Sequence, residues 1–201
     1  MPAPIITILL DLDGTLIDSE PGIRSSCRAA LRALGHAPDS SLDLSAGCVG
    51  ARHSIDAGLS GQGRPVVLVN VAGGAPGRTE QPRVRPDLAP GWTDFIPELN
   101  RQPQDHVVTK HTPGAFTNTG LDAHLRALGV TQVVIVGVAT SNGVEVTARQ
   151  AYELGFNVTL AIDAITDMRA DAHAYSLARV FPRIGETGTT REIIDLMEKG
   201  A

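Results

Sequence analysis

The chain contains 201 residues, of which 42% are hydrophobic and 19% are charged, and this composition is ordinary for one globular domain with a sizeable core. Its net charge of −5 argues against nucleic acid and anionic membranes as main partners. Because no apolar run is as long as a membrane span and the first residues do not resemble a signal peptide, we expect a cytoplasmic protein.

The hydrophobic pattern predicts strands and helices that alternate along the chain. A continuous apolar run, Ile5–Leu10, is typical of a strand buried on both faces. There follow, in order, predicted helices over 20–34 and 52–59, a strand over 66–71, a long loop over 73–104 with a short helix at 92–99, and a strand over 105–109. The second half adds helices over 121–128, 141–154, 170–179 and 191–199 (the last capped by Thr189), between strands over 133–138, 158–162 and 183–187. We therefore predict a single α/β domain over 1–201, a three-layer α/β/α, Rossmann-type fold with a doubly wound, mostly parallel sheet.

Polar residues follow the predicted strands, and ligands of such sheets bind outside the carboxyl ends of the strands. These residues are Asp11, Asp13, Asn70, Lys110, Thr140, Ser141, Asn142, Asp163 and, one turn further on, Asp167. A carboxylate and an ammonium at nearby strand ends, as with Asp11 and Lys110, can form a general acid–base pair or a purely structural ion pair. Trp92 and Phe116 either wall the same pocket or pack in the core.

The segment DLDGTLIDSE at Asp11–Glu20 resembles motif I of the haloacid dehalogenase (HAD) superfamily, and the likeness covers about residues 1–50. The resemblance implies a Mg²⁺-dependent phosphatase in which Asp11 is the nucleophile, Asp13 protonates the leaving group, and both can bind Mg²⁺. Lys110, Thr140 and the Asp163/Asp167 pair would fill the remaining roles. However, Thr140 follows Lys110, which reverses the order in that family, and no later segment resembles the other HAD motifs.

From about Pro65 to the C-terminus the chain resembles a different family, the isochorismatase-like cysteine hydrolases, so that the whole reads as a mosaic. The carrying segments are RPVVLVNVAGGAPGRTEQ, DHVVTKHTPGAFTNTGLDAHLRALGV and TQVVIVGVATSNGVEVTARQAYELGFNVTLAIDAITDM. This resemblance implies that Asp11 is the acid–base residue, that Lys110 is its partner, and that residue 143 is the nucleophile. Position 143 holds Gly143 instead of cysteine, which excludes a thiolate mechanism. The resemblance also implies a cis peptide bond at Val138–Ala139, with backbone N–H groups of residues 139–143 directed at an anionic ligand.

Isochorismatases proper resemble this chain in having glycine at the nucleophile position, and they cleave a vinyl ether by protonation and attack of water. Nicotinamidase-like relatives need the thiol for amide hydrolysis, and the metal-binding motif of that type is absent here. We therefore expect a hydrolase of a small anionic molecule that requires no cofactor and binds Mg²⁺ at most weakly, and that forms a homodimer or homotetramer. The expected catalytic positions are Asp11, Lys110 and Gly143, and the expected substrate-binding residues are Asn70, Trp92, Phe116, Ala139, Thr140, Ser141 and Asn142. A catalytically inactive oligomeric or binding protein is the third alternative.

Overall fold

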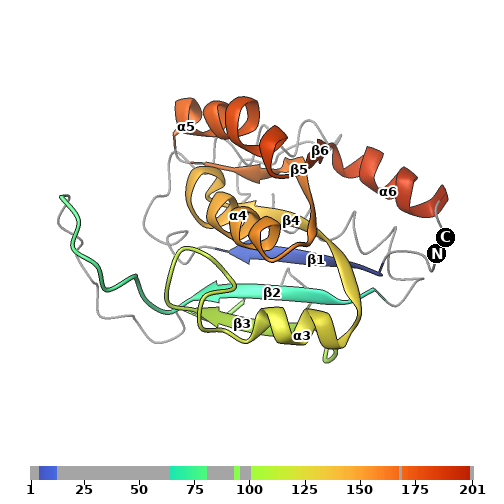
Figure 1. The fold of residues 1–201 in the computed structure, drawn as a ribbon, viewed down its shortest axis with the longest axis horizontal. Helices are drawn as coiled ribbons and strands as arrows, with labels where there is room; N and C mark the ends of the chain where they lie inside the picture. Colours follow the sequence, from blue (N-terminus) through green and yellow to red (C-terminus); the bar gives the residue numbers. More distant parts are fainter. Residues whose placement is uncertain (1–4, 13–63, 81–92, 96–100, 168, 200–201) are drawn as a thin grey trace, which may run out of the picture.

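A computed structural model describes residues 5–12, 64–80, 93–95, 101–167 and 169–199 (Figure 1). The expected helices at 20–34 and 52–59 lie outside these residues, as do Asp13 and Trp92. In the first strand, the side chains of Thr7 and Leu9 are described, and both are fully buried.

Six parallel strands form one sheet in the order β3-β2-β1-β4-β5-β6. Their bounds are Ile5–Leu12 (β1), Val66–Val71 (β2), His106–Lys110 (β3), Val130–Val138 (β4), Asn157–Thr166 (β5) and Glu186–Gly188 (β6). The chain builds outward from β1 in one direction to β3 and then in the other direction to β6. The carboxyl ends of β1 and β4 therefore flank the point where the strand order reverses, which is where ligands bind in doubly wound sheets.

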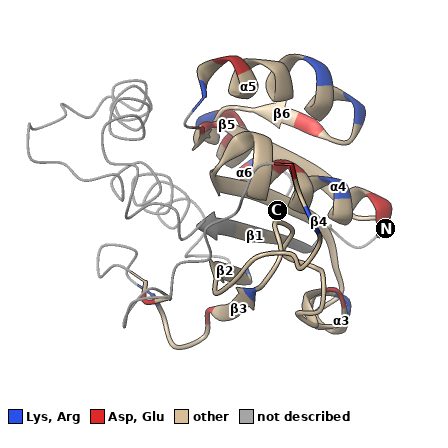
Figure 2. Cartoon of the chain, turned by 90° about the vertical axis from the view of Figure 1, so that its left-hand side faces the viewer, with Lys and Arg blue, Asp and Glu red and all other residues tan. Residues whose placement is uncertain are grey.

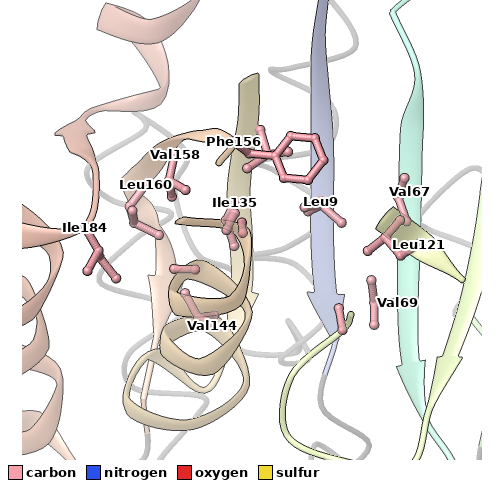
Figure 3. Packing of buried hydrophobic residues seen from close by; sticks show 14 of the residues in the cluster. Leu9, Val67, Val69, Leu121, Ile135, Val144, Phe156, Val158, Leu160 and Ile184 are labelled. Carbon is pink, nitrogen blue, oxygen red and sulfur yellow. The ribbon is translucent and has the colours of Figure 1, made fainter. Parts of the chain in front are cut away.

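Helices cover both faces of the sheet and bury its alternating side chains. On one face, α3 (Leu121–Ala127) and α4 (Glu145–Glu153) lie in front of the strands in Figure 1, and Figure 3 shows Leu9, Val67 and Ile135 on the strand side of this core. On the other face, α6 (Thr190–Lys199) buries Ile193, Ile194 and Met197 against Leu68, Val134 and Val136. The two sets come from alternate positions of the same strands, as the two-residue period of a strand requires. The predicted three-layer fold is therefore confirmed.

Glycines and a capping box set the ends of these helices. Gly129 (φ 72°) and Gly155 (φ 84°) follow α3 and α4 in the left-handed region, where a side chain would be strained. At the start of α6, Thr189 N donates to Glu192 Oε2 (2.8 Å) and Glu192 N donates to Thr189 Oγ1 (3.3 Å), which forms a capping box. The predicted helix cap at Thr189 is confirmed.

Strand β5 is longer than predicted, so the candidate residue Asp163 does not lie where we expected it. The strand continues to Thr166, so Asp163 lies within it instead of at its end. Asp163 Oδ1 accepts hydrogen bonds from Thr190 N (2.7 Å) and Thr190 Oγ1 (2.8 Å) at the start of α6. The expectation that Asp163 marks the end of the strand is wrong, because its carboxylate is satisfied by a helix N-terminus and does not interrupt the strand. Asp167 directly follows the strand in its place.

Two predicted helices begin or end differently. The helix expected from Ser141 starts as a single π-helical turn at Thr140–Val144, called the 140–144 turn below, and becomes regular α4 from Glu145. The helix expected over 170–179 is a regular α-helix only over α5 (Ala170–Tyr175). It continues as a π-helical turn at Ser176–Val180 and ends in a 3₁₀ turn at Phe181–Arg183.

Charged residues lie mainly on the outer elements. In Figure 2, both signs of charge occur on the helices, whereas β4 in the middle of the sheet is uncharged. Within the described part of the chain, no helix combines the length and the apolar character that a membrane span needs.

Candidate active site

The carboxyl end of β1 lies at the reversal point of the strand order. In the backbone register, Asp11 pairs with Val69 of β2 and with Gly137 of β4, and Leu12 pairs with Val138. The end of β1 also contacts the 140–144 turn, which follows β4. The position of Asp11 therefore lies at the end of the sheet where doubly wound folds bind their ligands.

Lys110 is the last residue of β3 and is 1% exposed, which makes it the largest fully buried side chain among the described residues. Its Nζ donates to the carbonyl oxygen of Pro113 at 2.7 Å. A buried ammonium is costly unless its donors are satisfied, so a lysine in this setting calls for a specific reason.

The positions of Lys110 and Asp11 lie on the same face of the sheet. Asp11 pairs with Val69, which pairs with Val108, and Lys110 is two residues beyond Val108. Because side chains alternate between faces, these positions share the face that α3 and α4 cover. Only β2 separates the two strands, which places them roughly 10 Å apart at two strand spacings. The register therefore places both residues at the same edge and on the same face, as an acid–base pair would need.

The loop after Lys110 is held by α4. Thr147 Oγ1 accepts a hydrogen bond from Ala115 N (3.1 Å), and Gln150 Oε1 accepts one from Phe116 N (3.1 Å). Gln150 Nε2 also donates to Thr117 Oγ1 at 2.6 Å. The ring of Phe116 lies 5.9 Å from the ring of Phe156 in the core. Phe116 is thus partly a core residue, which was one of its two expected roles.

The 140–144 turn contains residue 143, the position that the resemblance to cysteine hydrolases implies for a nucleophile. The peptide bond between Val138 and Ala139 is cis, as the resemblance implies. Thr140 and Gly143 are buried, whereas Ser141 and Asn142 are exposed.

The expectation that the backbone N–H groups of residues 139–143 face a ligand is wrong for two of them. Ser141 N donates to Asp167 Oδ2 at 2.7 Å, and Asn142 N donates to Ala139 O at 3.1 Å. Both donors are therefore used within the protein, since each has a carboxylate or carbonyl oxygen within hydrogen-bonding distance.

Residues after β5 contact the same turn through the side chains of Asp167, which was among the strand-end candidates, and of His173, which was not. Asp167 Oδ2 also accepts from Ser141 Oγ (2.7 Å), and Thr140 Oγ1 lies 2.9 Å from His173 Nδ1. Burial lowers the pKa of His173, and the carboxylate of Asp167 partly opposes this shift. The only sequence signal was an acidic residue shortly after a buried strand, and nothing local distinguished His173 from a histidine on a helix surface.

Asn70 is separated from Lys110 by the sheet itself. It follows Leu68 by two residues, so its position shares the α6 face, opposite to Val69. Its Nδ2 donates to Thr93 O (2.6 Å), and its buried Oδ1 has no hydrogen-bond partner in the described structure. The structure therefore does not place Asn70 beside the proposed acid–base pair.

Metal ligands are not gathered at this edge by the residues that the structure describes, since no three His, Cys, Asp or Glu side chains among them are grouped to hold an ion. The suggested Mg²⁺ site at Asp11 and Asp13 stays a prediction, because Asp13 lies outside the described residues.

The parallel sheet in this strand order, with helices on both faces, a buried lysine at the end of β3 and a π-helical turn after β4, is an α/β fold of the isochorismatase type. The isochorismatase domain model matches residues 52–192, and the chain belongs to this family of hydrolases. That match begins after the N-terminal residues in which we expected a likeness to HAD motif I, and the comparisons support only the isochorismatase family. Strand β1, which lies among those residues, is a central strand of the same sheet.

Two relatives and one solved structure show how close the likeness is. The chain is 39% identical over 109 residues to the isochorismatase family protein YwoC of Bacillus subtilis, a match that covers 54% of this chain and only 58% of that protein. It is 35% identical over 141 residues to YecD of Escherichia coli O157:H7, covering 67% of this chain and 75% of that protein. An isochorismatase family protein from Burkholderia thailandensis superposes with a TM-score of 0.79 at 31% identity, over 97% of this chain and 96% of that one.

Proposed function

We propose that this protein hydrolyses a small, anionic organic molecule without a cysteine nucleophile, and that Asp11 and Lys110 carry the acid–base chemistry. The observation that carries the proposal is the fully buried Lys110 at the end of β3, on the same face and edge of the sheet as the register position of Asp11. Family membership supports hydrolysis, and Gly143 removes the covalent route.

Cleavage of a vinyl ether fits these residues because it needs a proton and water but no nucleophilic side chain. Asp11 would donate its proton to the terminal carbon of the vinyl group, which leaves an oxocarbenium ion at the ether carbon. Water then adds to that carbon and loses a proton to the Asp11 carboxylate. The resulting hemiketal then breaks its bond to the leaving alcohol: its hydroxyl group loses a proton, the departing oxygen takes one up, and a ketone remains. Lys110 would stabilise the carboxylates of the enzyme and the substrate.

The test uses isochorismate, which is a carboxylate that contains a vinyl ether, together with nicotinamide as an amide. We expect the wild type to release pyruvate from isochorismate and to leave the amide intact. Asp11→Asn should lower kcat by at least about 100-fold, since general acid–base catalysis contributes that much, with the melting temperature retained. The matched control is Asp195→Asn on the outer face of α6, whose carboxylate pairs with Arg191. Full activity of Asp11→Asn would reject the proposal.

Two further outcomes separate the alternatives. Mg²⁺-dependent release of phosphate from p-nitrophenyl phosphate, lost in Asp13→Asn, would favour the HAD-type phosphatase over the hydrolase. We propose that no metal is required, so that EDTA leaves pyruvate release unchanged.

We also propose that the chain self-associates as a homodimer or homotetramer, which light scattering after gel filtration measures directly. An intact oligomer that turns over none of these compounds would support the inactive binding protein. A monomer would count against that alternative, because the alternative supposes an oligomer.

A further inference from the structure

Asp167 is a buried carboxylate that binds the 140–144 turn at one residue. It is 8% exposed, and its Oδ2 accepts two hydrogen bonds from Ser141, one from the backbone N–H and one from the hydroxyl group, both at 2.7 Å. Its other oxygen accepts from Arg169 N at 3.0 Å. Hydrogen bonds to an ionised oxygen are shorter and about twice as strong as neutral ones, so this contact constrains Ser141 strongly.

Two more side chains of the same segment contact neighbouring parts of the turn. His173 Nδ1 lies 2.9 Å from Oγ1 of Thr140, which is fully buried. Ser176 Oγ donates to Glu145 Oε2 at 2.7 Å, at the first residue of α4. Residues 140, 141 and 145 are therefore each bound by one side chain from the segment after β5, and Gly143 lies among them.

These contacts are more specific than packing alone requires. Ser141 is exposed, so its N–H and hydroxyl groups could bind water at little cost, yet both bind one buried carboxylate. A buried charge persists where it is well hydrogen-bonded, and here its main partner belongs to the turn at the proposed site.

We propose that Asp167 is a positioning residue which, with His173, fixes the 140–144 turn at the carboxyl end of the sheet. The role of Asp167 in catalysis rests on the proposed function, in which the 140–144 turn presents Gly143 and the adjacent backbone to the substrate. A displacement of about 1 Å in such a turn can lower the rate about 100-fold.

The first experiment uses the full chain without substrate and measures hydrogen exchange of the residue-141 amide by NMR. Asp167→Ala should raise its exchange rate at least about tenfold, because the acceptor is lost. Asp167→Asn should keep most of the protection, since one amide oxygen can still accept. Ser141→Ala is the matched control, because it removes the hydroxyl bond and keeps the bond from the backbone N–H.

Unchanged exchange in Asp167→Ala would overturn the proposal. If that variant does not fold, the wild-type spectrum decides, because an amide proton bound to a carboxylate at this distance should resonate clearly downfield, and its absence there would overturn the proposal too.

The second experiment measures kcat and KM with isochorismate. Asp167→Ala should lower kcat about 10- to 100-fold while KM changes less than about threefold, and Asp167→Asn should restore most of kcat. Faster exchange with an unchanged kcat would show that Asp167 holds the turn but does not serve catalysis. If instead Asp11→Asn remains fully active, the proposed function fails, and the exchange result still decides whether Asp167 fixes the turn.

Discussion

Gly143 stands at the position that the family resemblance implies for a nucleophile, and its φ angle is not in the left-handed region that favours glycine. The turn that contains it is helical, and Gly143 is absent from the described glycines with positive φ, which are residues 120, 129, 137 and 155. A left-handed conformation would have explained the residue sterically. The φ angle therefore does not account for the glycine, and a residue without a thiol at this position agrees with the chemistry that we propose.

Restoring a cysteine tests that view at a single residue. We expect Gly143→Cys to give a thiol that is acylated by p-nitrophenyl acetate in a burst of about one equivalent, because the thiol would sit at the proposed catalytic edge. Asn142→Cys is the matched control, since residue 142 is exposed on the same turn and should react only slowly. Peptide mass spectrometry separates position 143 from Cys27 and Cys48. Equal reactivity of the two new thiols would contradict the assignment of position 143.

At the scale of elements, α4 connects the two halves of the proposed site. Its first residues continue from the 140–144 turn, and its Thr147 and Gln150 bind the backbone of the loop after Lys110. Gly114 makes this approach possible, because a β-carbon there would overlap the side-chain amide of Gln150. One helix thus determines where both the turn and the lysine loop lie.

This docking predicts the effect of Gly114→Ala. The added methyl group forces the end of the Gln150 side chain away and breaks its hydrogen bonds to Phe116 N and Thr117 Oγ1, so we expect a loss of about 1–3 kcal/mol in the free energy of unfolding measured with urea. In a Gln150→Ala background the same substitution should cost less, since the obstructing side chain is gone. Gly77→Ala is the control, because a β-carbon added there would meet no atom within 4 Å, and it should change stability by less than about 0.5 kcal/mol. Equal costs for the two glycines would disprove the close contact.

Strands could be predicted where apolar runs are uninterrupted, and contacts between distant elements could not. Strand β2 has the predicted bounds, because five of its six residues are Val or Leu, and it lies between Pro65 and a segment rich in Gly and Ala. Strand β5 was predicted to stop before Asp163, since a charged residue normally ends a buried run. Its partner, Thr190, is 27 residues away and becomes visible only in the fold. The contacts of Asp167 and His173 with the 140–144 turn escaped prediction for the same reason.

On the scale of the whole molecule, two histidines are held in environments that favour the neutral form. The ring of His106 in β3 stacks on His124 of α3 with centroids 3.6 Å apart. Burial, and next the neighbouring His124, lower the pKa of His106, and burial lowers that of His173 beside Thr140. His106 joins β3 to α3, and His173 joins α5 to the 140–144 turn. Protonation of these two residues would therefore destabilise contacts in both parts of the fold.

Stability should therefore fall as the pH falls through the histidine range. Between the unfolded pKa of about 6.5 and the lower folded values, the unfolded chain binds more protons than the folded chain, so the free energy of unfolding decreases as the pH is lowered. We expect a lower melting temperature at pH 5.5 than at pH 7.5, a window in which exposed carboxylates stay mostly ionised. His124→Gln should reduce this difference, because it removes the contribution of His124 to the lowered pKa of His106 and leaves only the burial of His106 and His173. A melting temperature that is constant over this window, or that rises as acid is added, would contradict the argument, since the folded state would then bind at least as many protons as the unfolded one.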